Sequence, residues 1–164
     1  DEKMSSFFWD CSFRIKMKEG ILMGKKQEKA LEFHKKGYNC AQAVACTFSE
    51  EFGIREEDAF RMAEAFGLGM GQMDMCGAIT GMLMVIGMEN SIGNLQNGAP
   101  TKADTYRKAA LYTKKFREKN GSSYCRDLKG AKSGIPLCSC DQCIADAVDL
   151  AEEYLREAGK KRDE

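Results

Sequence analysis

The chain has 164 residues, and its 25 lysine and arginine residues balance 25 aspartate and glutamate residues, so the formal net charge is zero. This length suits one domain with a substantial core. A neutral chain lacks the basic footprint that nucleic acid or an anionic membrane surface requires. The longest apolar stretch, Ala78 to Met88, is about one third to one half of the length that crosses a bilayer. We therefore expect no nucleic-acid partner and no membrane-embedded segment.

The residues before Met23 differ from the rest of the chain. They lack helical periodicity, and Lys18-Glu19-Gly20, read back into codons, fits a purine-rich ribosome-binding stretch upstream of a Met23 start codon. We interpret residues 1–22 as a doubtful leader or, alternatively, as a disordered tail. The segment also lacks the basic head, apolar stretch and cleavage site of an export signal, which favours a cytoplasmic protein with reduced thiols.

From Lys25 onward, apolar residues at helical spacing alternate with glycine-marked turns, whereas strand-type alternation is absent and proline occurs twice. A flexible glycine turn is expected at residues 67–71. The pattern predicts an all-α, single-domain helical bundle of five to seven helices over residues 24–158, with the apolar helix at about residues 75–88 in its centre. The predicted helices are Lys25–Lys36, Cys40–Phe52, Arg55–Phe66, Met75–Met88, Thr101–Lys119, Ser122–Lys129 and Asp141–Ala158.

Four of the eight cysteines fall in the first turn of a predicted helix. The pairs of expected cap and following cysteine are Asn39 and Cys40, Asp74 and Cys76, Ser122 and Cys125, and Asp141 and Cys143. Unpaired backbone N–H groups and the positive end of the helix dipole stabilise a thiolate there. We therefore expect the pKa of each of these four thiols to be lowered, which suits disulfide exchange or binding of a soft metal.

Small residues surround the second of these cysteines. Gly77, Ala78 and Gly81 leave one face of the predicted central helix nearly bare. Such a face lets a cofactor or a partner thiol approach closely, so we predict these three residues as a binding surface. Tight packing of another helix is the equally supported alternative.

These features together resemble the C_GCAxxG_C_C family of redox-active proteins. The residues that carry the resemblance are Gly37-Tyr-Asn-Cys-Ala-Gln-Ala-Val44, Cys76-Gly-Ala-x-x-Gly81 (the CGAxxG motif), Cys125-Arg126-Asp127-Leu128 and Cys143, within Gly24 to Leu155. Its members are small bacterial or archaeal proteins, often encoded near transporter genes. The resemblance implies that Cys40, Cys76, Cys125 and Cys143 are the functional cysteines, with a redox or metal role.

The other cysteines and the single histidine receive simpler interpretations. Cys46 is expected to be a buried apolar residue, and Cys11 lies in the doubtful leader. Cys138 and Cys140 are interpreted as local additions, either resolving thiols or exposed loop cysteines, although Cys140 and Cys143 have the C-x-x-C spacing of redox and zinc sites. His34 is expected on a solvated, lysine-rich helix end.

Three functions remain open. The first is thiol–disulfide chemistry by an oxidoreductase that acts on a protein thiol or an electron-transfer partner, which the resemblance links to a transporter. The second is metal binding, with Cys40, Cys76, Cys125 and Cys143 holding zinc or an iron–sulfur cluster; the redox function would need no cofactor. The third is a non-catalytic helical interaction module in which the cysteines only pack.

Overall fold

The computed structural model describes residues 23–163, and within this range the chain is all-helical. Residues 1–22, with Cys11 and the interpretation as a leader, lie outside the described residues. The seven described α-helices are α2 (Lys25–Lys35), α3 (Cys40–Phe48), α4 (Glu56–Ala63), α5 (Gly77–Asn90), α6 (Lys102–Asn120), α7 (Cys125–Leu128) and α8 (Cys140–Asp163). Three short helical turns, η1 (Ser49–Phe52), η2 (Glu64–Phe66) and η3 (Gly69–Met73), complete the path. The predicted all-α fold is confirmed.

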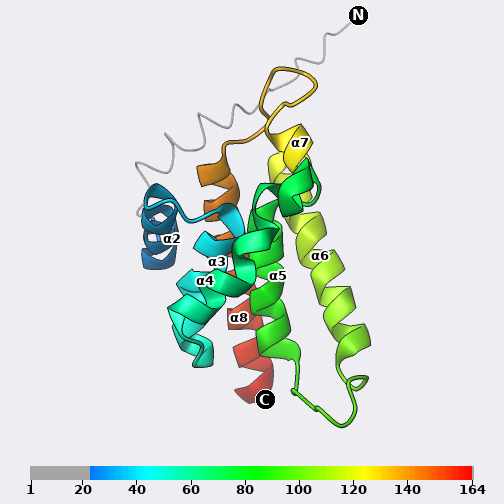
Figure 1. Cartoon of the computed structure of the whole chain (residues 1–164). Helices are drawn as coiled ribbons and strands as arrows, with labels where there is room; N and C mark the ends of the chain where they lie inside the picture. The colour runs from blue at the N-terminus through cyan, green and yellow to red at the C-terminus, as the bar shows by residue number, and fades with distance from the viewer. Residues whose placement is uncertain (1–22, 164) are drawn as a thin grey trace, which may run out of the picture.

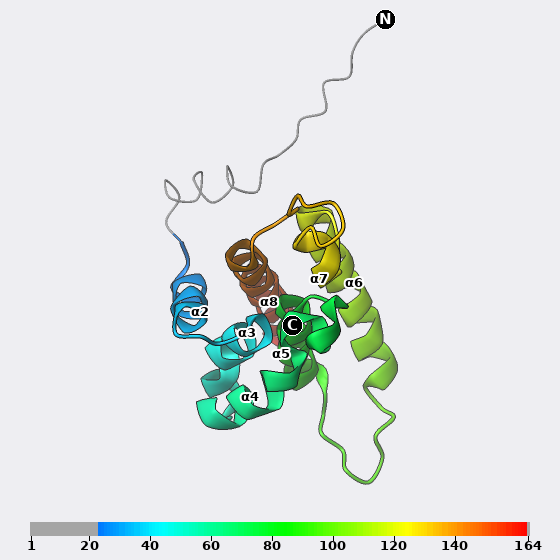
Figure 2. The same cartoon turned by 45° about the horizontal axis from the view of Figure 1, so that its top comes forward.

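Helix α5 lies in the middle of the bundle, as its apolar sequence predicts. It packs against α3, α6 and α8, and Figures 1 and 2 show these helices around it. Because Ile79, Met82 and Ile86 are fully buried, the helix presents apolar side chains to several neighbours. It begins at Gly77 rather than Met75, and the residue at its N-cap is Cys76, so the expected cap Asp74 is wrong.

Other helix ends shift for local reasons. The helices predicted to end at Phe52 and Phe66 each finish in a tighter turn, η1 and η2. After η1, Gly53 adopts a left-handed conformation, the usual way of stopping a helix. Helix α8 begins at Cys140 and continues to Asp163, which makes it longer at both ends than predicted.

The glycine-rich segment before α5 forms a defined turn. Three non-glycine residues in it, Leu68, Met70 and Met73, adopt left-handed backbone conformations. The Asp74 N–H donates to the Gly69 carbonyl at 3.1 Å and closes the turn. Left-handed conformations are strained for residues with a Cβ, so the surrounding packing must hold this segment in place.

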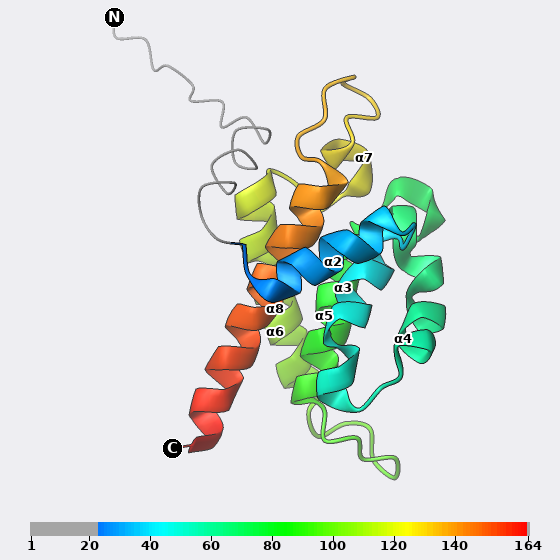
Figure 3. The same cartoon turned by 90° about the vertical axis from the view of Figure 1, so that its left-hand side faces the viewer.

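No described helix combines the length and the apolar character that crossing a membrane would require. In Figure 3, α8 runs the length of the bundle behind α2, and the loop between α5 and α6 lies at the opposite end from α7. The ends at which α3, α7 and α8 begin, together with the turn before α5, lie toward the upper part of Figure 1.

Candidate functional site

Six cysteines line one pocket of about 170 Å³, which we call the thiol pocket. Its sulfur-bearing residues are Cys40, Cys76, Cys125, Cys138, Cys140 and Cys143. The four predicted site cysteines are therefore brought together, joined by two that the sequence presented as local additions. Within the described residues none of the six forms a disulfide, and Cys40 and Cys140 are half-buried whereas the other four are buried.

The start of α3 positions Cys40. The Asn39 side chain accepts a hydrogen bond from the Gln42 N–H at 2.9 Å, and the Gln42 side chain accepts one from the Asn39 N–H at 2.9 Å. Asn39 also donates from its amide to the Glu64 carbonyl at 2.8 Å. This reciprocal cap fixes the first turn of α3, and Cys40 is its first residue, as predicted.

Two backbone hydrogen bonds hold Cys76 and Cys125 beside each other. The Cys76 N–H donates to the Ser123 carbonyl at 2.9 Å, and the Cys125 N–H donates to the Asp74 carbonyl at 2.7 Å. Between them, Met75 and Tyr124 form an isolated antiparallel β-bridge. The bridge brings the residues at the starts of α5 and α7 into the same pocket. Tyr124, and not the expected Ser122, is the residue before α7.

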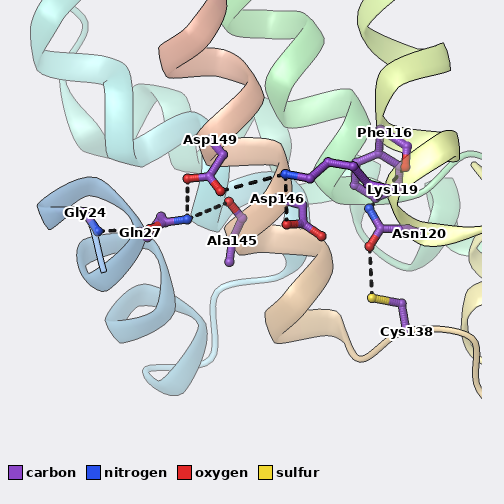
Figure 4. A network of polar contacts seen from close by, with 9 residues as sticks. All are labelled: Gly24, Gln27, Phe116, Lys119, Asn120, Cys138, Ala145, Asp146 and Asp149. Carbon is purple, nitrogen blue, oxygen red and sulfur yellow. Dashed lines mark hydrogen bonds and ion pairs between the residues drawn. The ribbon is translucent and has the colours of Figure 1, made fainter. Parts of the chain in front are cut away.

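Cys138, Cys140 and Cys143 come from the segment that enters α8. Ser139 takes the capping role expected of Asp141, because its hydroxyl accepts from the Gln142 N–H at 3.1 Å and its carbonyl from the Cys143 N–H at 3.0 Å. Cys140 is the first residue of α8, and Cys143 lies one turn in. The Cys138 thiol donates to the Asn120 side-chain oxygen at 3.1 Å, as Figure 4 shows.

Cys140 is the thiol that the pocket ionises most readily. A hydrogen bond from the Cys40 thiol, followed by the charges of Lys129 and His34, lowers the pKa of Cys140 to about 6 against the opposing effect of burial. Lys129 also hydrogen-bonds the Cys140 sulfur. The same hydrogen bond raises the pKa of Cys40, which stays protonated as the donor. These two residues form what we call the surface pair.

A second set of sulfurs lies deeper in the pocket. A hydrogen bond from Cys143 lowers the pKa of Cys76, and the backbone N–H groups of Ala78 and Ile79 in the first turn of α5 act in the same direction. Hydrogen bonds to Cys138 and to Cys76, together with burial, raise the pKa of Cys143. We call Cys76, Cys138 and Cys143 the buried trio.

The expected lowering of the pKa at all four predicted cysteines is therefore wrong for three of them. Only Cys76 follows it; the pKa values of Cys40, Cys125 and Cys143 are raised. Cys40 and Cys143 donate hydrogen bonds to neighbouring sulfurs, which favours their protonated forms. Burial is the largest cause at Cys125, and the nearby Cys76 adds to it.

Helix α3 occupies the bare face of α5. A Cβ added at Gly81 would lie 2.8 Å from the Ala41 carbonyl oxygen and 2.8 Å from the Val44 Cβ. At Gly77 it would lie 3.0 Å from the Phe66 carbonyl oxygen and 3.2 Å from the Cys40 Cβ. The small residues thus allow close helix packing, Ala78 is fully buried, and Gly77 alone of the three lines the thiol pocket.

Sequence reasoning missed the cationic side of the pocket. Lys129 and His34 both line it, and His34 forms a 2.6 Å contact from Nδ1 to Asp141 Oδ1 instead of lying on a fully solvated face. The interpretation of Cys138 as an exposed loop cysteine is also wrong, because it is 3 % exposed. The C-x-x-C spacing was the only sequence signal for a functional role of Cys140, and it indicated Cys143, not Cys40, as its partner.

One other expectation has a clear outcome. Cys46 is fully buried in the core, outside the thiol pocket, and its thiol donates to the Glu56 carbonyl at 3.7 Å, so the prediction of a core residue is confirmed. Arg126, beside Cys125 in the sequence, stacks over the Tyr124 ring at 4.6 Å. Within residues 23–163, no group of three or more Cys, His, Asp or Glu side chains has an arrangement that could hold a metal ion.

A larger pocket of about 390 Å³ lies between α3, α4 and α5. Its lining is apolar except for Ser49, whose hydroxyl donates to the Cys46 carbonyl at 3.0 Å. None of the residues that line it has an ionisable side chain.

Over the described residues, the fold and the pocket define an all-helical, cysteine-rich protein whose cysteines converge from four helix starts and one loop. A family model described as "Putative redox-active protein (C_GCAxxG_C_C)" matches residues 38–154, and the chain belongs to this family. No curated protein and no solved structure gives a significant match.

Proposed function

We propose that this chain is a thiol–disulfide redox protein in which the surface pair, Cys140 and Cys40, cycles between a dithiol and a disulfide. Cys140 is the attacking thiolate and Cys40 the resolving thiol. The observation that carries the proposal is that these two half-buried cysteines line the same pocket as Lys129. The interaction between the two thiols lowers the pKa of Cys140 and raises that of Cys40. Exchange requires such a pair, an accessible thiolate next to a second thiol.

The reaction consumes a disulfide of a partner molecule. The Cys140 thiolate attacks one partner sulfur, the partner S–S bond breaks, and the other partner sulfur leaves as a thiolate. The Cys40 thiol then loses its proton, and its sulfur attacks Cys140 in the mixed disulfide. The Cys40–Cys140 bond forms, the first partner sulfur departs as a thiol with the proton that Cys40 lost, and two electrons have passed to the partner.

The proposal departs from the four-cysteine assignment at one position. Cys140 replaces Cys143 as the reactive thiol of α8, because Cys143 is buried and its pKa is raised, whereas the pKa of Cys140 is lowered. A pair that works as a dithiol needs a compartment that keeps thiols reduced, so we place the protein in the cytoplasm, with a protein or low-molecular-weight disulfide as its partner.

Disulfide mapping tests the proposal. The reduced chain is purified without oxygen, incubated with excess oxidised glutathione, quenched with acid and N-ethylmaleimide, and digested for mass spectrometry. We expect a Cys40–Cys140 disulfide in the wild type and in the matched control Cys46→Ser, which removes a thiol outside the pocket. In Cys40→Ser we expect Cys140 to accumulate as a mixed disulfide with glutathione, because the resolving thiol is gone.

Metal analysis of the same preparation distinguishes the alternative function. Iron or zinc near one atom per chain, released only when the pocket cysteines are alkylated, would support a metal centre and contradict the redox pair. Cys40 and Cys140 that both remain as unmodified thiols in excess oxidised glutathione would also contradict the proposal.

A further inference from the structure

The thiol pocket holds more sulfur than one dithiol couple uses. Besides the surface pair, it is lined by four buried cysteines, and one of these, Cys143, interacts with both Cys76 and Cys138. We propose that the buried trio is a second redox centre. In it, Cys76 takes the disulfide from the surface pair, and Cys138 and Cys143 form the couple that stores it. This inference rests on the proposed function, and it lets each chain transfer a second pair of electrons.

The placement of Cys138 supports a specific role for this residue. It is 3 % exposed although it lies in the loop that precedes α8, and its thiol donates to the side chain of Asn120, which is 5 % exposed. Its backbone N–H also bonds the Leu128 carbonyl at 3.3 Å. Figure 4 shows the thiol pointing to the end of α6. Cys138 is therefore held in a defined, buried position in the thiol pocket, which Cys143 also lines.

Three exchange steps carry the disulfide inward. The Cys76 thiolate attacks the Cys40 sulfur of the Cys40–Cys140 disulfide, and Cys140 leaves as a thiolate. Cys143 then attacks Cys76, which releases Cys40, and the proton of Cys143 passes to Cys40. Finally Cys138 attacks Cys143, the Cys138–Cys143 bond forms, and Cys76 leaves as a thiolate while the proton of Cys138 passes to solvent.

The direction of transfer follows from the surroundings of the leaving sulfurs. Cys140 leaves beside Lys129, and Cys76 leaves at the first turn of α5, where the N–H groups of Ala78 and Ile79 face its sulfur. A couple whose reduced form has a stabilised thiolate gives up its disulfide readily. Cys138 and Cys143 lie in the buried part of the pocket, where desolvation disfavours a thiolate, so their disulfide is the more stable of the two.

The overall electron balance includes a second oxidant molecule. One external disulfide oxidises the surface pair, relay to Cys138–Cys143 leaves the surface pair reduced, and a second external disulfide oxidises it again. Each chain then oxidises four thiols and gives up four electrons, compared with two thiols and two electrons for the surface pair alone.

A time course of oxidation tests the relay. The wild type and Cys76→Ser, which differs by a single atom, receive one equivalent of oxidised glutathione and are quenched and mapped at intervals, with Cys46→Ser as the matched control. In the wild type and in Cys46→Ser, the Cys40–Cys140 disulfide should appear first and give way to Cys138–Cys143. In Cys76→Ser, the disulfide should stay at Cys40–Cys140, and the yield of Cys138–Cys143 should fall at least about tenfold because the connecting thiolate is missing.

The outcomes separate this inference from the function on which it rests. A wild-type disulfide that remains at Cys40–Cys140 throughout the time course overturns the relay and leaves the proposed function intact. A disulfide that comes to rest between Cys76 and Cys143 overturns the role of Cys138. If neither the wild type nor Cys76→Ser forms Cys40–Cys140 at any time, the proposed function fails and the relay fails with it.

Discussion

The side chains of Lys129 and Cys140 share a hydrogen bond in the thiol pocket, although Lys129 follows the short helix α7 and Cys140 begins α8. The charge of Cys140 in turn raises the pKa of Lys129. After the hydrogen bond from Cys40, the Lys129 charge is the largest influence that lowers the pKa of Cys140. A thiolate beside an ammonium group is the state that the pocket favours at neutral pH.

The pH dependence of alkylation follows directly. Since the pKa of Cys140 is about 6, its reaction with iodoacetamide should reach half its maximal rate near pH 6 and a plateau by about pH 7.5, whereas an unperturbed thiol reaches half-maximum near pH 8.5. Peptide-resolved mass spectrometry of the reduced chain measures this profile. A midpoint for Cys140 above about pH 8 would contradict the assignment of the thiolate.

Removing the ammonium group should shift that profile. Lys129→Gln is expected to raise the alkylation midpoint of Cys140 by roughly one pH unit, because a nearby positive charge is lost while the hydrogen bond from Cys40 remains. Lys132→Gln is the matched control, since Lys132 is exposed on the following loop and does not line the pocket. If the alkylation midpoint of Cys140 shifted equally in both variants, the net charge of the chain, and not the contact between Lys129 and Cys140, would explain the shift.

The stability of the reduced chain should also depend on pH through Cys140. Its pKa in the folded state, about 6, lies below the value of about 8.5 for an unfolded thiol. Between these values the unfolded state binds more protons, so stabilisation by this group is complete above the upper value and is lost as the pH falls through 6. Urea unfolding of the wild type and Cys140→Ser should show a smaller rise in stability from pH 6 to 8.5 in the variant. If the free energy of unfolding rose equally with pH in both proteins, the lowered pKa of Cys140 in the folded state would be contradicted.

Close packing of α5 on α3 can be tested at two glycines of the same helix. Gly81→Ala should lower the free energy of unfolding by about 1–3 kcal/mol, because the new methyl group would overlap the Ala41 carbonyl and Val44. Gly87→Ala is the control, since nothing lies within 4 Å of its added Cβ. There the higher helix propensity of alanine should leave stability unchanged or raise it by up to about 1 kcal/mol. Denaturant unfolding followed by circular dichroism measures both; an unaffected Gly81→Ala would contradict the packing.

The parts of the site that depend on neighbours in sequence could be predicted from the sequence. Asn39 followed by Cys40 and Gln42 is a local capping pattern, and the structure contains it. The apolar run of α5 likewise predicts a central helix, because such a helix must be covered by several others.

The parts that depend on distant contacts could not be predicted. The pKa of Cys40 is set by a hydrogen bond to Cys140, about 100 residues away, and this contact reverses the effect expected from a helix start. Cys138 looks like a loop cysteine because its burial depends on Asn120 and on the path of the loop after Lys129. No local pattern encodes either contact.

The bridge between Met75 and Tyr124 joins two distant segments, so it can form only after the ribosome has made both of them. As the ribosome extends the chain, Cys40 and Cys76 emerge long before Cys125, and α8 with its two cysteines comes last. Contacts between distant segments form late in folding, so the thiols meet only after nearly the whole bundle has been synthesised and α8 has packed on α5. A nascent chain therefore carries separate thiols, and an oxidant that reaches it early would act on them before the thiol pocket has assembled.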